Sequence, residues 1–208
     1  MKYAIISLVI ILLLALNNTQ SHAGWLIYHK PEFKGRVIDA ESKEPIEGAV
    51  VAVVYYKFLP GLTGTGGNSD VMKVKETLTD KKGEFYFPPY TTLIQPFSTE
   101  DKAEFVIYKP GYGHPKYTPY GITPVNEEKF FSKEIGSTGE LDLGPNDEMV
   151  KVTFGIVELL KLKTREERLM AMPSPVSEIE YKNQKILIKL LNEENKNLGL
   201  KGQYKIEE

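Results

Sequence analysis

Apolar and polar positions between residues 33 and 112 follow the pattern of short strands separated by turns. Residues 33–40 and 84–87 are rich in β-branched and aromatic side chains, and residues 72–79 and 104–108 mix such side chains with charged ones. Runs of this kind, bounded by Gly, Pro and Asp, are typical of a small β-sandwich. The pattern therefore predicts a mainly β fold, an antiparallel β-sandwich.

Residues 49–56 stand out as an almost unbroken apolar run. A strand with one wetted face would alternate, so this run predicts a central strand that is covered on both faces. Residues 80–83 read Asp-Lys-Lys-Gly and predict a hairpin turn, because Asp can bond to the backbone ahead of it and Gly accepts a positive φ. The Gly-rich residues 60–69 predict a flexible loop. Residues 24–31 predict either a first strand that leads into the domain or an arm packed on it.

The later part of the chain is less regular. Residues 110–147 are rich in Gly, Pro and Tyr and predict a long excursion, with some strand near residues 130–135. Residues 150–162 alternate again and predict the last long strand.

After residue 162 the periodicity becomes helical. Thr164 and Glu167 have the spacing of a capping box and predict a short helix; Ser177 and Glu180 have the same spacing and predict a longer one, with Gly199 as a C-cap. An apolar stripe at helical spacing is formed by Ile179, Ile186, Leu187, Leu190 and Leu191. This stripe would pack on the sandwich or on a partner, and the pattern leaves both open.

The N-terminus has the organisation of a secretory signal. Lys2 precedes an apolar run over residues 4–16, and Ser21-His-Ala23 places small residues where a signal peptidase reads, which predicts cleavage before Gly24. The run is shorter than the ~20 residues that span a bilayer, so a cleaved signal is favoured over the alternative of a retained membrane anchor. No later segment is apolar enough to cross a membrane, so we expect no membrane span after cleavage. The predicted organisation is a signal peptide at 1–23, a β-sandwich domain at 24–162 and a helical extension at 163–208.

The charge balance and the absence of Cys limit the class of partner and the cellular location that we expect. The chain has 26 basic and 28 acidic residues, and this balance lacks the basic excess of a nucleic-acid partner. It has no Cys, so no disulfide holds the exported protein together. We therefore expect a bacterial periplasmic or cell-surface location.

Candidate catalytic and metal-binding residues are sparse. His29 and His114 are far apart and belong to no zinc-binding motif, and the Gly-rich run 61–67 lacks the Lys that contacts phosphate. Asp142, Asp147 and Glu148 lack the alternating spacing of a calcium loop. The sequence thus predicts no enzyme, no cofactor and no metal site.

One stretch has the composition of a binding surface. Residues 108–120 carry four tyrosines among Gly and Pro: Tyr108, Tyr112, Tyr117 and Tyr120. Tyr offers an apolar face and a polar tip at low entropic cost, so this loop could bind a glycan or a partner protein, or it could simply cover the edge of the sandwich.

The strand and turn residues also resemble a known family. The matching segments are 35–39 (Gly-Arg-Val-Ile-Asp), 44–50 (Glu-Pro-Ile-Glu-Gly-Ala-Val), 79–85 (Thr-Asp-Lys-Lys-Gly-Glu-Phe) and 111–112 (Gly-Tyr). Together they resemble the carboxypeptidase regulatory-like domain, a prealbumin-like (transthyretin-like), seven-stranded β-sandwich. The resemblance implies an accessory or interaction role; residues 108–117 contain only one His, so they lack the His pair of the similarly folded intradiol dioxygenases.

These observations favour a non-enzymatic, exported structural or protein-interaction module of the bacterial cell envelope. Its partner would be a protein that the sequence does not identify, or a cell-envelope glycan. The alternative is a carbohydrate or cell-wall binding module that uses the Tyr-rich loop 108–120.

Overall fold

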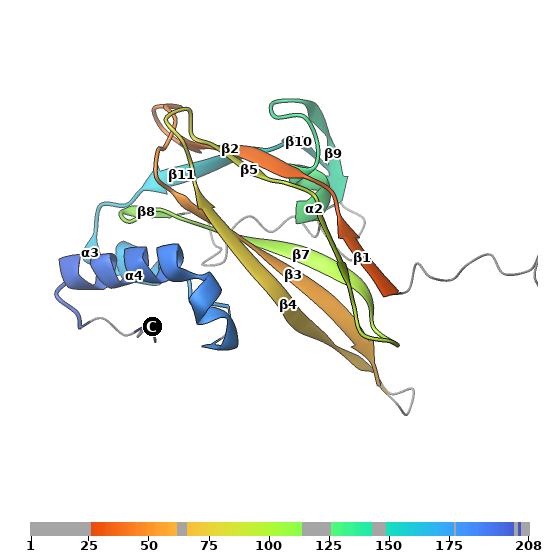
Figure 1. The fold of residues 1–208 in the computed structure, drawn as a ribbon. Helices are drawn as coiled ribbons and strands as arrows, with labels where there is room; N and C mark the ends of the chain where they lie inside the picture. The colour runs from red at the N-terminus through yellow and green to blue at the C-terminus, as the bar shows by residue number, and fades with distance from the viewer. Residues whose placement is uncertain are drawn as a thin grey trace, which may run out of the picture.

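A computed structural model describes residues 26–61, 66–113, 126–142, 149–176, 178–201 and 204. These residues form a mainly β molecule with sandwich-like packing, so the predicted fold class is confirmed (Figure 1). The predicted signal segment, residues 1–23, lies outside the described residues. The strands are β1 (Ile27–Lys30), β2 (Phe33–Asp39), β3 (Val50–Pro60), β4 (Gly67–Leu78), β5 (Glu84–Phe87), β6 (Tyr90–Leu93), β7 (Thr99–Tyr108), β8 (Tyr112–Gly113), β9 (Thr138–Asp142), β10 (Met149–Thr153) and β11 (Ile156–Lys161). The helices are α2 (Glu127–Phe131), α3 (Arg165–Met170), the 3₁₀ helix η2 (Glu178–Asn183) and α4 (Lys185–Asn197).

Two larger sheets form the sandwich. One has the strand order β5-β2-β11-β8 and the other the order β4-β3-β7. Nearly all pairs are antiparallel, but β11 runs parallel to β2. Two small two-stranded sheets, β1-β6 and β9-β10, complete the β structure of the described residues.

Strand β3 is the centre of the molecule, as its apolar sequence predicts. Val51, Val53 and Tyr55 face the main core between the sheets. Val50 and Val54, on the opposite face, are also buried, in two further apolar clusters. Burial of both faces explains why this strand does not alternate.

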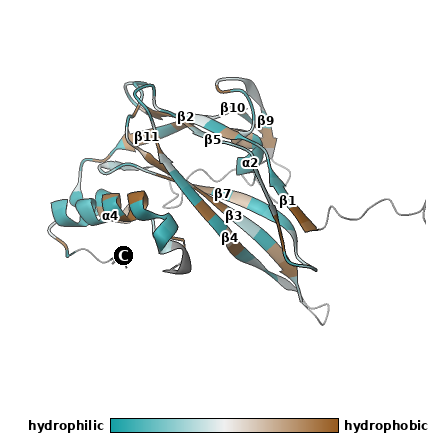
Figure 2. Ribbon diagram, in the orientation of Figure 1, coloured by the Kyte–Doolittle hydropathy of each residue, from teal (hydrophilic) through white to brown (hydrophobic). Residues whose placement is uncertain are grey.

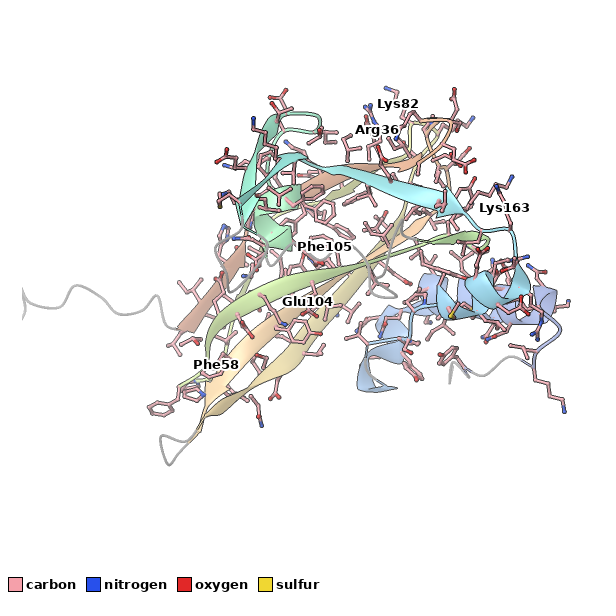
Figure 3. All side chains as sticks on the ribbon, turned by 180° about the vertical axis from the view of Figure 1, so that it is seen from behind. Arg36, Phe58, Lys82, Glu104, Phe105 and Lys163 are labelled. Atoms are coloured by element: carbon pink, nitrogen blue, oxygen red, sulfur yellow. The ribbon has the colours of Figure 1, made fainter. Side chains whose placement is uncertain are left out.

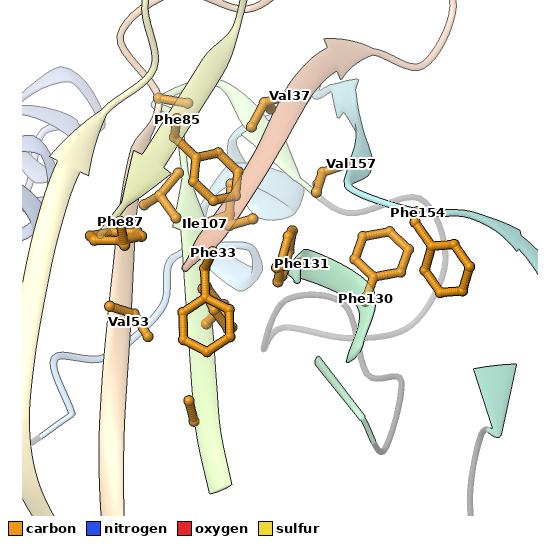
Figure 4. Close-up of a cluster of buried hydrophobic side chains, with 14 of the residues drawn as sticks. Phe33, Val37, Val53, Phe85, Phe87, Ile107, Phe130, Phe131, Phe154 and Val157 are labelled. Atoms are coloured by element: carbon orange, nitrogen blue, oxygen red, sulfur yellow. The ribbon is translucent and has the colours of Figure 1, made fainter. Parts of the chain in front are cut away.

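An aromatic cluster fills the main core (Figure 4). The ring centroid of Phe105 lies 5.1 Å from that of Phe33 and 4.4 Å from that of Phe131, and Phe85 lies 5.4 Å from Phe131. Offset and edge-to-face contacts of this kind add to the stability that burial provides. Phe131 belongs to helix α2, so the strand predicted near residues 130–135 is wrong. Asn126 caps α2 by accepting a hydrogen bond from the backbone N–H of Lys129, and the helix turns its Phe pair inward.

The turn at residues 80–83 has the predicted chemistry but a different role. Asp80 Oδ1 accepts hydrogen bonds from the backbone N–H groups of Lys82 and Glu84, and Gly83 has a φ of 72°. The flanking strands are not paired with each other, because β4 belongs to the β3 sheet and β5 to the β2 sheet. The hairpin prediction is therefore wrong: the turn carries the chain from one sheet to the other.

Two other boundaries differ from the sequence prediction. Strands β3 and β4 pair as far as Pro60 and Gly67, so the loop expected over residues 60–69 is shorter. The strand expected over residues 150–162 is two strands, β10 and β11, because Gly155 has a φ of 70° and interrupts the extended backbone. Only glycine takes such a conformation at low cost.

The C-terminal helices pack on the sandwich. Leu187 and Leu191 of α4 are buried against Val50 and Tyr108, on the face of the β4-β3-β7 sheet that points away from the main core. Figure 1 shows α4 alongside this sheet, and Figure 2 shows hydrophobic residues both in α4 and along β3. The open question about the apolar stripe is thus resolved in favour of intramolecular packing. Of the described residues, no helix is long and apolar enough to span a membrane.

Polar contacts fix the position of these helices. Glu76 of β4 accepts hydrogen bonds from the backbone N–H groups of Ile186 and Leu187, at 2.5 and 3.0 Å, and so caps the N-terminus of α4. Arg168 of α3 forms a two-pronged ion pair with the buried Glu194 of α4, with both N–O distances 2.7 Å. The predicted capping box of Thr164 and Glu167 is present.

The sequence prediction is confirmed at the C-terminal end of α4 but not at its N-terminal end. Gly199 follows the helix with a φ of 76°, as a C-terminal glycine should. The helix begins after Gln184, however, and the segment before it is the 3₁₀ helix η2. Ser177, the predicted N-cap, lies outside the described residues.

Candidate interaction surface

The structure describes two of the four tyrosines of the predicted Tyr-rich surface, Tyr108 and Tyr112. Tyr108 is only 3% exposed and lies beneath α4, where burial raises the pKa of its hydroxyl above the ordinary value. Tyr112, in the short strand β8, is partly buried against the main core. Tyr117 and Tyr120 lie outside the described residues. The ring of Tyr108 is therefore covered by the protein's own helix, and the binding role of the loop 108–120 stays a prediction.

The candidate metal ligands are not brought together in the described residues. His29 is exposed on β1, where its Nδ1 lies 2.7 Å from Thr91 Oγ1, while His114 and the acidic pair Asp147 and Glu148 fall outside that part of the chain. Across the described ranges, no group of three or more His, Cys, Asp or Glu side chains could hold a metal ion.

Apolar side chains are exposed on the β1-β6 pair and in the turn that follows β6. Figure 1 shows β1 at the end of the sandwich away from the turns at residues 40–45 and 80–83. Ile27 of β1 and Leu93 of β6 are directly opposite each other in the register and are 44% and 77% exposed. Phe97, in the turn that follows β6, is 80% exposed. We call Ile27, Leu93 and Phe97 the apolar end.

Phe97 is held in an unusual backbone conformation. Its φ is 68°, and Ser98 donates both its backbone N–H and its hydroxyl to the carbonyl of Gln95, at 3.2 and 2.6 Å. With Pro96 in second place, this is the pattern of a type II β-turn, whose third position requires a positive φ and usually holds Gly or Asn. A bulky side chain there costs roughly 1–2 kcal/mol. The molecule thus accepts backbone strain at the residue that presents an exposed ring.

A buried ion-pair network around Lys30 fixes β1, the strand that carries Ile27. Lys30 is only 3% exposed, and its Nζ lies 2.7 Å from Glu128 Oε1 and 2.9 Å from Glu100 Oε1. The backbone N–H of His29 donates to the other oxygen of Glu100. Since a buried cation is tolerated only when it is paired, these contacts fix β1 against β7 and α2.

Helix α2 also covers the edge of β7. Glu128 Oε1 accepts a hydrogen bond from the backbone N–H of Ala103 at 2.6 Å, and Glu127 Oε2 accepts one from Phe105 at 2.5 Å. Burial raises the pKa of Glu127 to about 8. An uncovered edge strand would invite pairing with another chain, so these two carboxylates block that mode of association at residues 103–105.

Two buried tyrosines, one from β1 and one from β3, pack against each other in the main core. Tyr28 and Tyr55 meet edge to face with ring centroids 6.3 Å apart, and burial raises the pKa of both hydroxyls above the ordinary value. Neither hydroxyl has a hydrogen-bond partner within the described residues. The contact between the two rings ties β1 to β3 within the main core.

The apolar end was missed in the sequence. The Gln95-Pro-Phe-Ser98 segment carries a turn signal, since Pro is favoured at the second position of a type II turn. The third position of such a turn usually holds Gly or Asn. The Phe at this position is the sequence feature that could have indicated an exposed ring.

Comparison with known proteins adds no identification. A scan against protein-family models, a search of curated proteins and a search of solved structures each gave no match to this chain.

Proposed function

We propose that this chain is a non-enzymatic structural or protein-interaction module, exported to the bacterial cell envelope, and that its protein partner binds the apolar end. The observation that carries this proposal is Phe97, a strongly exposed aromatic ring held out by a turn with positive φ. Backbone strain of this kind is found preferentially at functional positions.

The energetics of the apolar end suit a binding anchor. Complete burial of a Leu, Ile or Phe side chain contributes about 1.5–3 kcal/mol. Leu93 and Phe97 are 77% and 80% exposed, whereas Ile27 is 44% exposed. Because Lys30 fixes β1 in place, little conformational entropy is lost when a partner docks, and such rigid anchors dominate interface energetics.

Export and family membership belong to the same proposal. The signal-like residues 1–23 and the absence of Cys support a periplasmic or cell-surface location. The resemblance of residues 35–39, 44–50 and 79–85 to the carboxypeptidase regulatory-like domain supports an accessory role rather than catalysis. Glycan binding by the loop 108–120 is not carried further, since Tyr108 is covered by α4.

Site-specific photo-crosslinking in the native cells tests the proposal. A photoreactive phenylalanine analogue is placed at Phe97 and, as a matched control, at Tyr86, which is 53% exposed on β5. We expect a discrete protein adduct from position 97 and none of the same mass from position 86. Equal adducts from both positions, or none from position 97, would overturn the proposal.

A substitution separates binding from folding. Asn tolerates a positive φ, so Phe97→Asn relieves strain while it removes the ring. We expect the stability of this variant to stay within about 1 kcal/mol of the parent, because the ring is mostly exposed. The adduct formed by an analogue at neighbouring Leu93 should be lost in the same background; an unchanged adduct counts against Phe97 as an anchor.

A further inference from the structure

A second candidate site lies at the end of the molecule away from β1, between the turns that carry the chain from sheet to sheet (Figure 1). A shallow groove of about 370 Å³ is lined there by four cationic side chains: Arg36, Lys43, Lys81 and Lys82. Figure 3 shows Arg36 and Lys82 together at this end, and Phe58 at the other. Arg36 extends from β2, Lys43 from the turn after β2, and the other two lysines from the turn before β5.

Four of the acidic groups at this end are already engaged, whereas Glu41 and Glu44 are exposed in the turn after β2. Glu84 pairs with Arg36, and Glu158 lies 2.8 Å from Lys43. Asp39 and Asp80 each accept hydrogen bonds from two backbone N–H groups of their own turns. None of these carboxylates lines the groove.

The groove retains donors that could receive a ligand. Lys81 and Lys82 are exposed and form no ion pair with any other residue that the structure describes. The Nε of Arg36 is buried and has no hydrogen-bond partner among those residues. Arg and Lys together provide directed and adaptable donors for a carboxylate or a phosphate group.

The remaining lining is apolar. Ile38, Pro45 and Ile156 line the groove together with the cationic side chains and give it a non-polar surface. A sugar ring presents C–H groups that can cover such a surface while a charged substituent reaches the lysines. The volume is within the range of small-molecule sites.

From this arrangement we infer that the groove binds an anionic saccharide through its carboxylate or phosphate group. This inference does not depend on the apolar end, because the two sites lie at opposite ends of the molecule. The binding should weaken as salt is raised, since the lysines are exposed and their field is screened.

Titration of the intact protein followed by NMR or calorimetry tests this inference. The probes are trigalacturonic acid for a carboxylate, glucose 6-phosphate for a phosphate, and neutral maltotriose. The test variant is Lys81→Gln/Lys82→Gln, which leaves Asp80 and Gly83 to hold the turn. The matched control, Lys133→Gln/Lys163→Gln, makes the same charge change at two other exposed positions.

We expect at least one anionic probe to bind, at least a fivefold weaker dissociation constant for Lys81→Gln/Lys82→Gln, and less than a twofold change for the control. Binding of only one anionic probe identifies the group that is recognised. The inference is overturned if neither anionic probe binds, if maltotriose binds equally well, or if both variants weaken binding alike.

Discussion

Removing the side chain of Leu187 tests whether α4 is a structural layer of the fold. Leu187 is fully buried in the cluster with Val50, Tyr108 and Leu191, between the helix and the sheet. In Leu187→Ala the isobutyl group is cut to a methyl, and the lost transfer free energy is about 2–3 kcal/mol. The cavity left between helix and sheet raises the expected loss of stability to about 3–5 kcal/mol.

Urea unfolding followed by circular dichroism measures this loss, and the melting temperature of a chain of this size should fall by about 6–20 °C. Leu93→Ala is the matched control, because the same atoms are removed from a side chain that is 77% exposed. We expect the control to stay within about 0.5 kcal/mol of the parent. A Leu187→Ala variant as stable as this control would refute the packing of α4 on the sheet.

Two further predictions concern the turn at Gly83 and the carboxylate of Glu127. A Cβ at Gly83, where φ is 72°, would lie 2.3 Å from the carbonyl oxygen of Val37, whereas one at Gly111, where φ is 80°, would meet nothing within 4 Å. Thermal melts should therefore show a loss of about 1–2 kcal/mol for Gly111→Ala and a clearly larger loss, above about 3 kcal/mol, for Gly83→Ala; equal losses would contradict the close approach. Burial raises the pKa of Glu127 from 4.5 to about 8, so the folded protein binds the extra proton between these values and loses stability as the pH rises through this window. In Glu127→Gln, whose amide oxygen can still accept from Phe105, stability measured from pH 5 to 8 should fall less steeply than in the parent, and identical slopes would count against a buried carboxyl.

The sequence predicted correctly those elements that are determined by residues close to one another in the chain. The unbroken apolar run of β3 indicated burial on both faces, and the Thr164–Glu167 spacing gave a helix N-terminus that forms as expected. The stripe of α4 was also visible as a periodicity. In each of these cases the residues that determine the outcome lie within about a dozen positions of one another.

Other features depend on contacts that are distant in sequence. Tyr108 is buried because α4 covers it, some eighty residues later, and nothing near Tyr108 signals this. The sequence of Phe130 and Phe131 is compatible with a strand or with a helix. In the helix that forms, Phe131 packs against Phe85 and Phe105, which are distant in sequence. Similarly, Asp80 and Gly83 fix a chain reversal but not the sheet that the next strand joins.

Native-state hydrogen exchange tests the central claim most directly, namely that the sandwich and α4 form one body. The amides of Leu191 in α4 and Val53 in β3 are the ones to compare, since both residues are fully buried in different layers. If the helix is a layer of the fold, both amides should exchange with opening free energies within about 1 kcal/mol of global unfolding. Exchange of the Leu191 amide at a free energy several kcal/mol below that of Val53 would contradict the account, because it would mean that α4 opens while the sandwich stays folded.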